Sequence, residues 1–327
     1  MSEANNACRV SVLYTTHRPE TVDALYKEMS RHEAVFLEEP SFSDFPDMLE
    51  GRIPIEDYLM SRDDEYPEFA LRSCRMFQTL HRRGTSLFQV EPFIEELLGI
   101  HEFFADGSGP SDLTPGTTRY WVYMAEHLAT RALLDFYRVS LVGTFEETVA
   151  AVKAFARTDA SRFRLRDEMR ADALAPLVCG FNSVCVEAGY MHALLWRLLQ
   201  ERIVGRVRVR PVYLLGDRMS EAGARRRNLG PGDVLTLHYL FHPERDDPVL
   251  DLLAARSLLY AKLIEKEEMT AGAGQFPHFK NEMETGRMAD ALRFEDCRRL
   301  YPLICRSSTV KARRIVLGYM DRQGKRS

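Results

Sequence analysis

Short apolar runs alternate with longer amphipathic stretches along the first two thirds of this chain. The apolar runs have the length of buried strands, and the stretches between them carry apolar side chains at helical spacing. The first two runs enclose a helical stretch as a βαβ unit, which favours parallel pairing of the strands. Strands are predicted at 9–14, 34–37, 86–90, 183–186 and 207–215, and helices at about 19–31, 66–83, 161–174 and 193–203.

These elements predict an α/β fold with a mainly parallel or mixed sheet flanked by helices. The clearest loop, at 105–112, is followed by two predicted helices divided near Gly143. The sequence contains no low-complexity segment or linker that requires a domain boundary. We therefore expect a single domain over residues 1–327, with residues 105–158 as a helical insertion or cap.

Composition and charge limit which binding partners and which cellular compartment we expect for this protein. Of the 327 residues, 45% are hydrophobic, and the formal net charge is −4. This balance gives no basic surface for nucleic acid, and no apolar run reaches the ~20 residues of a membrane span. A polar start without a signal peptide and six scattered cysteines without a CxxC pair predict a cytoplasmic protein. The composition is compatible with a homo-oligomer and with a small-molecule or peptide substrate.

Two histidines follow predicted strands at the same point of the strand-to-helix connection. Gly189-Tyr190-Met191-His192 ends the strand at 183–186, and Tyr14-Thr15-Thr16-His17 ends the first strand. In α/β proteins, binding sites form at the carboxyl ends of the strands. We therefore predict that His17 and His192 converge on one site. Glu38 and Glu39 directly follow the second strand, and because neighbouring side chains alternate, only one of them would face the site at this edge of the sheet.

The order of these elements resembles that of the TraB/PrgY–Tiki superfamily, which is related to the erythromycin-esterase-like and ChaN-like proteins. The family pattern is strand–Gly-x-x-His, strand–Glu, helix–Glu-Arg-Asp-x-x-Met-Ala and strand–Gly-x-x-His, and the likeness spans roughly residues 9–200. His17, Glu38 and His192 fall on the family histidines and glutamate, and Arg166-Asp167 falls on the Arg-Asp pair.

The sequence departs from this family pattern at several positions, which affects the geometry expected of the site. Tyr14 replaces the first glycine, Leu165 replaces the glutamate before Arg-Asp, and Met169 comes one residue early. In addition, Glu187 adds a carboxylate on the strand before His192. The first turn is therefore built differently from that of the family.

The resemblance implies hydrolysis of an amide or ester bond, in a substrate that resembles a peptide. His17, Glu38 and His192 would hold a divalent transition metal such as Mn, Co or Zn, which acidifies a bound water. Arg166 would hold a substrate carboxylate or stabilise a developing oxyanion, and Asp167 would orient Arg166 or pair with a histidine. Without a metal or another cofactor, His17 becomes the general base and Glu38 its orienting partner.

Other interpretations of the same residues remain open. The pocket would equally serve a non-catalytic protein that binds a metal, haem or a small metabolite, as ChaN-like relatives suggest. A histidine such as His192 is commonly a core residue, and the charges between Arg162 and Asp172 are typical of a solvated helix face. A further strand is expected at 234–241, on which His238 and His242 would share a face.

Overall fold

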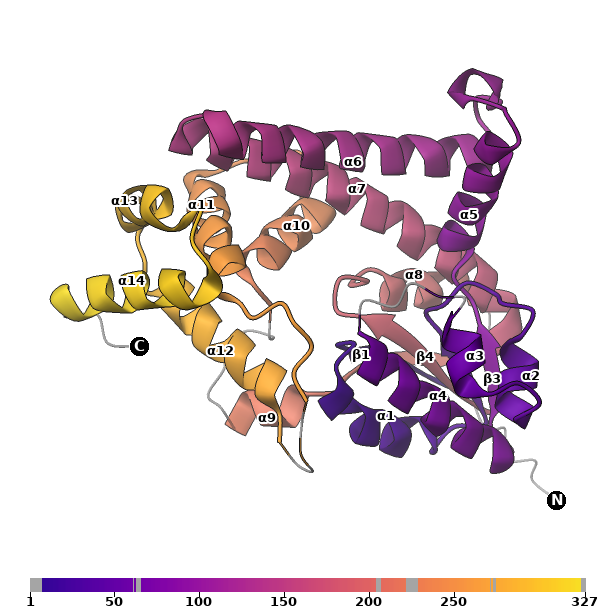
Figure 1. The fold of residues 1–327 in the computed structure, drawn as a ribbon. Coiled ribbons are helices and arrows are strands. Elements are labelled where there is room, and N and C mark those ends of the chain that lie inside the picture. The colour runs from indigo at the N-terminus through magenta and orange to yellow at the C-terminus, as the bar shows by residue number, and fades with distance from the viewer. Residues whose placement is uncertain are drawn as a thin grey trace. The chain divides into compact units, whose positions relative to one another are not determined.

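The computed structural model describes residues 8–60, 62, 66–203, 207–221, 229–270, 272 and 275–324. Its residues group into two compact units, each built from several segments of the chain. The first unit comprises residues 1–123, 164–218 and 270–275, and the second comprises 124–163, 219–269 and 276–327. Figure 1 labels many of the helices and strands of both units. Within the described residues, no helix is both long and apolar enough to cross a membrane.

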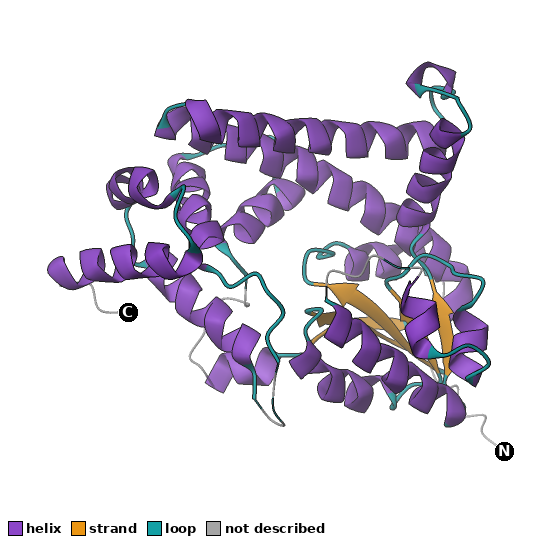
Figure 2. Ribbon diagram, viewed as in Figure 1, coloured by secondary structure: helices purple, strands orange, loops and turns teal. Residues whose placement is uncertain are grey.

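The first unit contains a five-stranded sheet in which every neighbouring pair is parallel (Figure 2). The strand order is β3-β2-β4-β1-β5, so β4 lies between β1 and β2 although it follows both in sequence. The expected α/β fold with a parallel sheet is therefore confirmed. The strands are β1 (Arg9–Thr15), β2 (Ala34–Leu37), β3 (Ser86–Gln89), β4 (Ser183–Gly189) and β5 (Arg208–Tyr213).

One face of this sheet is covered by the helices that join β1, β2 and β3. Leu13, Val35 and Cys185 contribute that face of the sheet to the core. Side chains alternate along a strand, so Glu187 lies on this face with Cys185, whereas Tyr14 and Val186 lie on the other. The covering elements are η1 (Pro19–Thr21), α1 (Val22–Met29), α2 (Phe45–Glu50), α3 (Ile55–Met60) and α4 (Pro67–Arg82).

The opposite face carries α8 (Leu195–Arg202) and the last part of α7 (Phe145–Val178), as Figure 1 shows. This part of α7 is anchored by Arg170, whose Nε donates to the Val90 carbonyl oxygen at 2.9 Å. The arginine is fully buried although it belongs to the run of charges that suggested a solvated helix face. Also in this unit are α5 (Pro92–Ala105), η2 (Pro110–Asp112) and the start of α6 (Thr118–Val142).

The described elements of the second unit are helical. They are the rest of α6, the first part of α7, α10 (Pro231–Phe241), α11 (Pro248–Leu263), α12 (Pro277–Asp290), α13 (Phe294–Ile304) and α14 (Thr309–Arg322), while α9 (Gly216–Glu221) runs across the boundary between the units. The predicted division near Gly143 is confirmed, because α6 ends at Val142 and α7 begins at Phe145. That residues 105–158 form an insertion or cap within a single domain stays a prediction.

The prediction of a strand at 234–241 is wrong, because this segment forms part of helix α10. Pro231 occupies its first turn, and Asp233 Oδ2 accepts a hydrogen bond from the Gly230 amide at 2.8 Å. A proline and an N3 carboxylate are signals of a helix start, and they override the β-forming residues that follow. His238 and His242 are consequently neighbours one helical turn apart, with ring centroids 5.4 Å apart.

Candidate functional site

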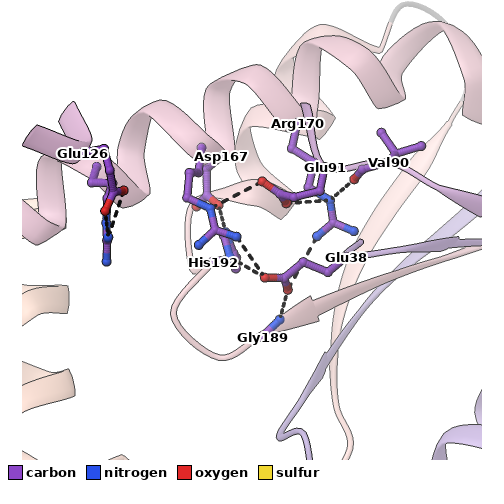
Figure 3. Close-up of polar contacts among 10 residues, drawn as sticks. Glu38, Val90, Glu91, Glu126, Asp167, Arg170, Gly189 and His192 are labelled. Carbon is purple, nitrogen blue, oxygen red and sulfur yellow. Dashed lines mark hydrogen bonds and ion pairs between the residues drawn. The ribbon is translucent and has the colours of Figure 1, made fainter. Parts of the chain in front are cut away.

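His192 lies at the centre of a buried cluster of charged side chains behind the carboxyl ends of β2 and β4. Its Nδ1 lies 2.5 Å from Asp167 Oδ1, and its Nε2 lies 2.8 Å from Glu38 Oε1 (Figure 3). Asp167 comes from α7 and Glu38 directly follows β2. Because each ring nitrogen faces a carboxylate oxygen, both must carry a proton. His192 is therefore an imidazolium held between two carboxylates.

The backbone around His192 is fixed by the same groups. The Gly189 amide donates to Glu38 Oε2 at 2.5 Å, and the Leu194 amide donates to Asp167 Oδ2 at 3.0 Å. Tyr14, at a position where the TraB-like pattern has glycine, donates its hydroxyl to the His192 carbonyl oxygen at 3.0 Å. The departure at Tyr14 therefore supplies a tether for the turn that carries His192.

The pKa values in the cluster follow from burial opposed by these ion pairs. Burial alone would lower the pKa of His192, but the charges of Glu38 and Asp167 and their hydrogen bonds raise it to about 9. Burial alone would raise the pKa of Glu38, but His192, Arg170 and Arg166 hold it well below its usual range. Near neutral pH, His192 is therefore charged and Glu38 ionised.

Two arginines from α7 complete the cluster. Arg166 lies 3.4 Å from both Glu38 Oε1 and Glu91 Oε1, and Arg170 lies 3.7 Å from Glu38 Oε2 and from Glu91 Oε2. Glu38, Glu91 and Asp167 supply three negative charges, and the two arginines with His192 supply three positive ones. Charges can be buried at this density because the group as a whole is neutral.

A cavity of about 220 Å³ opens on the α1–α4 side of the sheet edge, and Glu38 lines it. His17 also lines it, with its ring stacked on Phe69 at a centroid distance of 5.4 Å. The ring of His17 is exposed, in contrast to the buried His192. The remaining lining residues are Glu39, Leu59, Arg62, Tyr66, Ala70, Ser73, Cys74, Phe77 and Glu187.

Glu187 is a carboxyl group in this cavity whose pKa is raised, whereas that of Glu38 is lowered. The Glu187 side chain comes from β4 and is 6% exposed. Burial, helped by the charges of Glu39 and Glu38 and opposed by those of His17 and Arg170, raises the pKa of Glu187 to about 7. A carboxyl group that exchanges its proton near neutral pH in a cavity is suited to acid–base catalysis.

Glu39 and Arg62 of the cavity lining belong to an ordered network of polar side chains. Arg62 Nη1 lies 3.2 Å from Glu39 Oε2 and donates to the Tyr58 hydroxyl at 3.0 Å. Gln89, at the end of β3, donates to the same Glu39 oxygen at 2.7 Å. By contrast, the buried Ser73 hydroxyl has no hydrogen-bond partner among the described residues.

The structure thus brings four of the five predicted site residues into direct contact. Glu38, Arg166, Asp167 and His192 share the buried cluster, and His17 shares the cavity with Glu38. Glu38 is the link between the two groups. The expected convergence of the histidines stays a prediction, because His17 contributes to the cavity and His192 to the cluster.

The predicted ligand set of His17, Glu38 and His192 does not fit a metal ion in this arrangement. Both nitrogens of His192 are engaged with carboxylates, so neither offers the lone pair that a metal requires. Across the described part of the chain, no group of three or more His, Cys, Asp or Glu side chains is arranged to hold a metal.

Sequence reasoning missed Glu91, Arg170 and the role of Glu187. Arg170 lies in the same run of charges as Arg166, one helical turn further on, and that spacing was the available signal. Glu187 stood out as an additional carboxylate on the strand before His192. Its place in the cavity depends on which face of β4 it occupies.

Comparison with known proteins places the chain beside one archaeal protein. An uncharacterized protein of Archaeoglobus fulgidus is 33% identical over 291 residues, covering 89% of this chain and 97% of the archaeal protein. No family model matches the chain, and no solved structure matches it. None of these comparisons indicates a reaction, so the geometry of the site is the evidence for its chemistry.

Proposed function

The chain belongs to the same family as the uncharacterized Archaeoglobus fulgidus protein, and we propose that it hydrolyses an ester or amide bond in the cavity of its first unit. The observation that carries the proposal is the presence of Glu187 beside His17 in one cavity. Burial is the main cause that raises the pKa of Glu187 to about 7, and His17 is close enough for its positive form to lower that pKa. One accessible imidazole and one neutral carboxylic acid form an acid–base pair.

In the proposed reaction, His17 acts as the general base and Glu187 as the general acid. The imidazole of His17 takes a proton from water while the water oxygen bonds to the carbonyl carbon. The bond from that carbon to the leaving oxygen or nitrogen then breaks, and protonated Glu187 gives its proton to the leaving atom. Proton transfer from the imidazolium to the Glu187 carboxylate restores both groups for the next turnover.

Ser73 is proposed to stabilise the transition state. Its hydroxyl is buried in the cavity wall without a partner among the described residues, so it is free to donate to the developing oxyanion. A donor already held in place costs no reorganisation when the charge develops. Arg166, to which the family resemblance gave this role, instead contacts Glu38 and Glu91 in the buried cluster.

Glu38 is proposed to act through its fixed charge. Its carboxylate is held ionised by His192 and the two arginines of the cluster, and it raises the pKa of Glu187. The cavity has a volume of about 220 Å³, below the ~300–1,000 Å³ that is typical of small-molecule sites. We therefore propose a substrate that inserts a small acyl or amide group, with the rest of the molecule outside.

This proposal is the metal-free version of the chemistry that the TraB-like resemblance suggested. It needs no ion at His192, whose nitrogens are both occupied. Dialysis of the purified protein against EDTA is expected to leave its hydrolytic rate unchanged. Loss of activity with recovery on addition of Mn²⁺, Co²⁺ or Zn²⁺ would favour the metal-dependent version.

The decisive test measures hydrolysis of p-nitrophenyl acetate and of a matching acetyl anilide by four proteins. His17→Ala is expected to lower kcat/KM by roughly 100-fold or more, because general base catalysis typically contributes ~10²–10⁴. His101→Ala is the matched control, because His101 is an exposed histidine on α5. Glu187→Gln is expected to lose the part of the pH profile in which activity falls as the pH rises through about 7.

Two outcomes would count against the proposal. Full activity in folded His17→Ala would remove the base and with it the mechanism. Absence of turnover in the native protein, combined with a higher Tm in the presence of a small amide, would instead support a non-catalytic binding protein.

A further inference from the structure

The second unit contains a larger cavity whose lining residues all belong to that unit. It has a volume of about 420 Å³ and is formed by α6, α7, α10 and α11 with the end of α13. This volume lies in the range of ~300–1,000 Å³ that is typical of small-molecule sites. The acid–base pair of the proposed active site takes no part in it.

The walls of this cavity are mainly apolar. Phe136 comes from α6, Phe155 from α7, Leu235 from α10 and Leu258 from α11. Tyr301 of α13 adds a further aromatic ring. Walls of this composition suit a ligand with an apolar body, because they offer dispersion contacts and release water on binding.

Small residues keep the space open. Gly230 lies so close to the ring of Tyr260 that a Cβ at this position would be 2.9 Å from Tyr260 Cε1. Ala156 and Gly232 line the same cavity, and Ala156 is 3% exposed. The start of α10 can thus lie directly against α11, and the small side chains leave the cavity beside these helices unfilled.

More positively than negatively charged side chains line the cavity. Lys262 and Lys266 line it, and no carboxylate of the described residues forms an ion pair with either one. Asp233 also lines it, but its Oδ2 accepts the Gly230 amide, and burial raises its pKa. Two lysines without acidic partners beside an apolar cavity complement a negatively charged head group.

We propose that this cavity binds an amphipathic organic anion, with the apolar body among the aromatic walls and a carboxylate beside Lys262 and Lys266. The apolar body supplies the buried area, and the lysines select the anion over neutral or cationic analogues. The site is independent of the proposed hydrolytic centre, so the two proposals can fail separately.

Isothermal titration calorimetry with decanoate, 1-naphthoate and decyltrimethylammonium tests this proposal on the full chain. Decanoate or naphthoate is expected to bind with one site per chain, and the preferred one identifies an acyl or an aromatic body. Decyltrimethylammonium is expected to bind at least tenfold more weakly. The double variant Lys262→Glu/Lys266→Glu should weaken anion binding at least tenfold, whereas Lys280→Glu, an exposed lysine on α12, should leave it unchanged.

A second variant separates the cavity from the surface around it. Ser140 is a partly exposed residue in the cavity lining, so Ser140→Phe should obstruct the cavity with little effect on folding, which circular dichroism checks. Equal binding of decanoate and decyltrimethylammonium, or unchanged decanoate binding in folded Ser140→Phe or in the lysine double variant, overturns the proposal. His17→Ala should bind the anion as the native protein does, because His17 lies in the other unit.

Discussion

Replacement of Glu187 by glutamine should stabilise the protein at alkaline pH while it impairs catalysis. Glu187 is 6% exposed, and no hydrogen bond to its carboxyl group occurs among the described residues. Ionisation therefore leaves a buried charge near the carboxylates of Glu38 and Glu39. Glutamine has nearly the same shape and remains neutral at every pH, so Glu187→Gln removes that charge without changing the packing.

The sign and size of the effect follow from the two pKa values of the group. The pKa of Glu187 is about 7 in the folded chain, against an ordinary value of 4.5. Because the folded state binds this proton more tightly, the stabilising contribution is complete below pH 4.5 and is lost as the pH rises through 7. The difference corresponds to about 3 kcal/mol of unfolding free energy. Glu187→Gln should therefore gain about 3 kcal/mol relative to the native chain between pH 4 and pH 8.5.

Guanidinium unfolding followed by tryptophan fluorescence measures this difference. The two tryptophans of the chain, Trp121 and Trp196, both belong to the first unit, so the signal follows the unit that contains Glu187. Glu201→Gln is the matched control, because Glu201 is exposed on α8 and its replacement should not change the pH dependence. Unfolding free energies of Glu187→Gln and native protein that stay parallel over this pH range would refute the reasoning.

Three further substitutions test the buried cluster and the helix contact at α10. Arg170→Met should lower the unfolding free energy by ~3–5 kcal/mol in denaturant titrations at pH 7, because it removes one of the three cations that balance the buried carboxylates. Asp167→Asn should lower the pKa of His192 from about 9, as read from the ring proton shifts in an NMR titration, and an unchanged pKa would contradict the assigned ion pair. Gly230→Ala should cost ~1–3 kcal/mol in thermal unfolding, since its Cβ would be 2.9 Å from an aromatic carbon, whereas Gly232→Ala meets its nearest atom at 3.5 Å and should be tolerated.

Local patterns predicted the strands of the sheet but not the order in which they lie. Apolar runs of strand length mark β1, β2 and β4, because strands buried on both faces are mainly apolar. The strands at the two edges of the sheet, β3 and β5, are only partly buried. The position of β4 between β1 and β2 depends on the path of the long connection from β3, which no short pattern encodes. The helix α10 was misassigned because Leu235, Tyr239 and Leu240 also suit a strand, although their spacing fits one helix face.

The site was predictable where a residue follows a strand and unpredictable where burial decides its role. His17 and His192 were found from their positions after strands, and Glu38 was chosen over Glu39 from the order of the TraB-like pattern. Arg170 was not found, because a run of charges on a helix gives no indication of which member faces the sheet. Its complete burial follows from the tertiary contact of its Nε with the Val90 carbonyl oxygen.

The buried cluster and the cavity together explain how neighbouring glutamates take different protonation states. Glu38 faces His192 and two arginines, and these cations hold it ionised despite its burial. Glu187 has a comparable burial, but its carboxyl group has no such set of cations, and the fixed charge of Glu38 is among the causes that raise its pKa. A carboxylate locked in its charged form therefore helps to keep its neighbour protonated near pH 7. Two carboxyl groups whose environments separate their pKa values are what acid–base catalysis requires, and here the separation depends on the charged cluster behind the cavity.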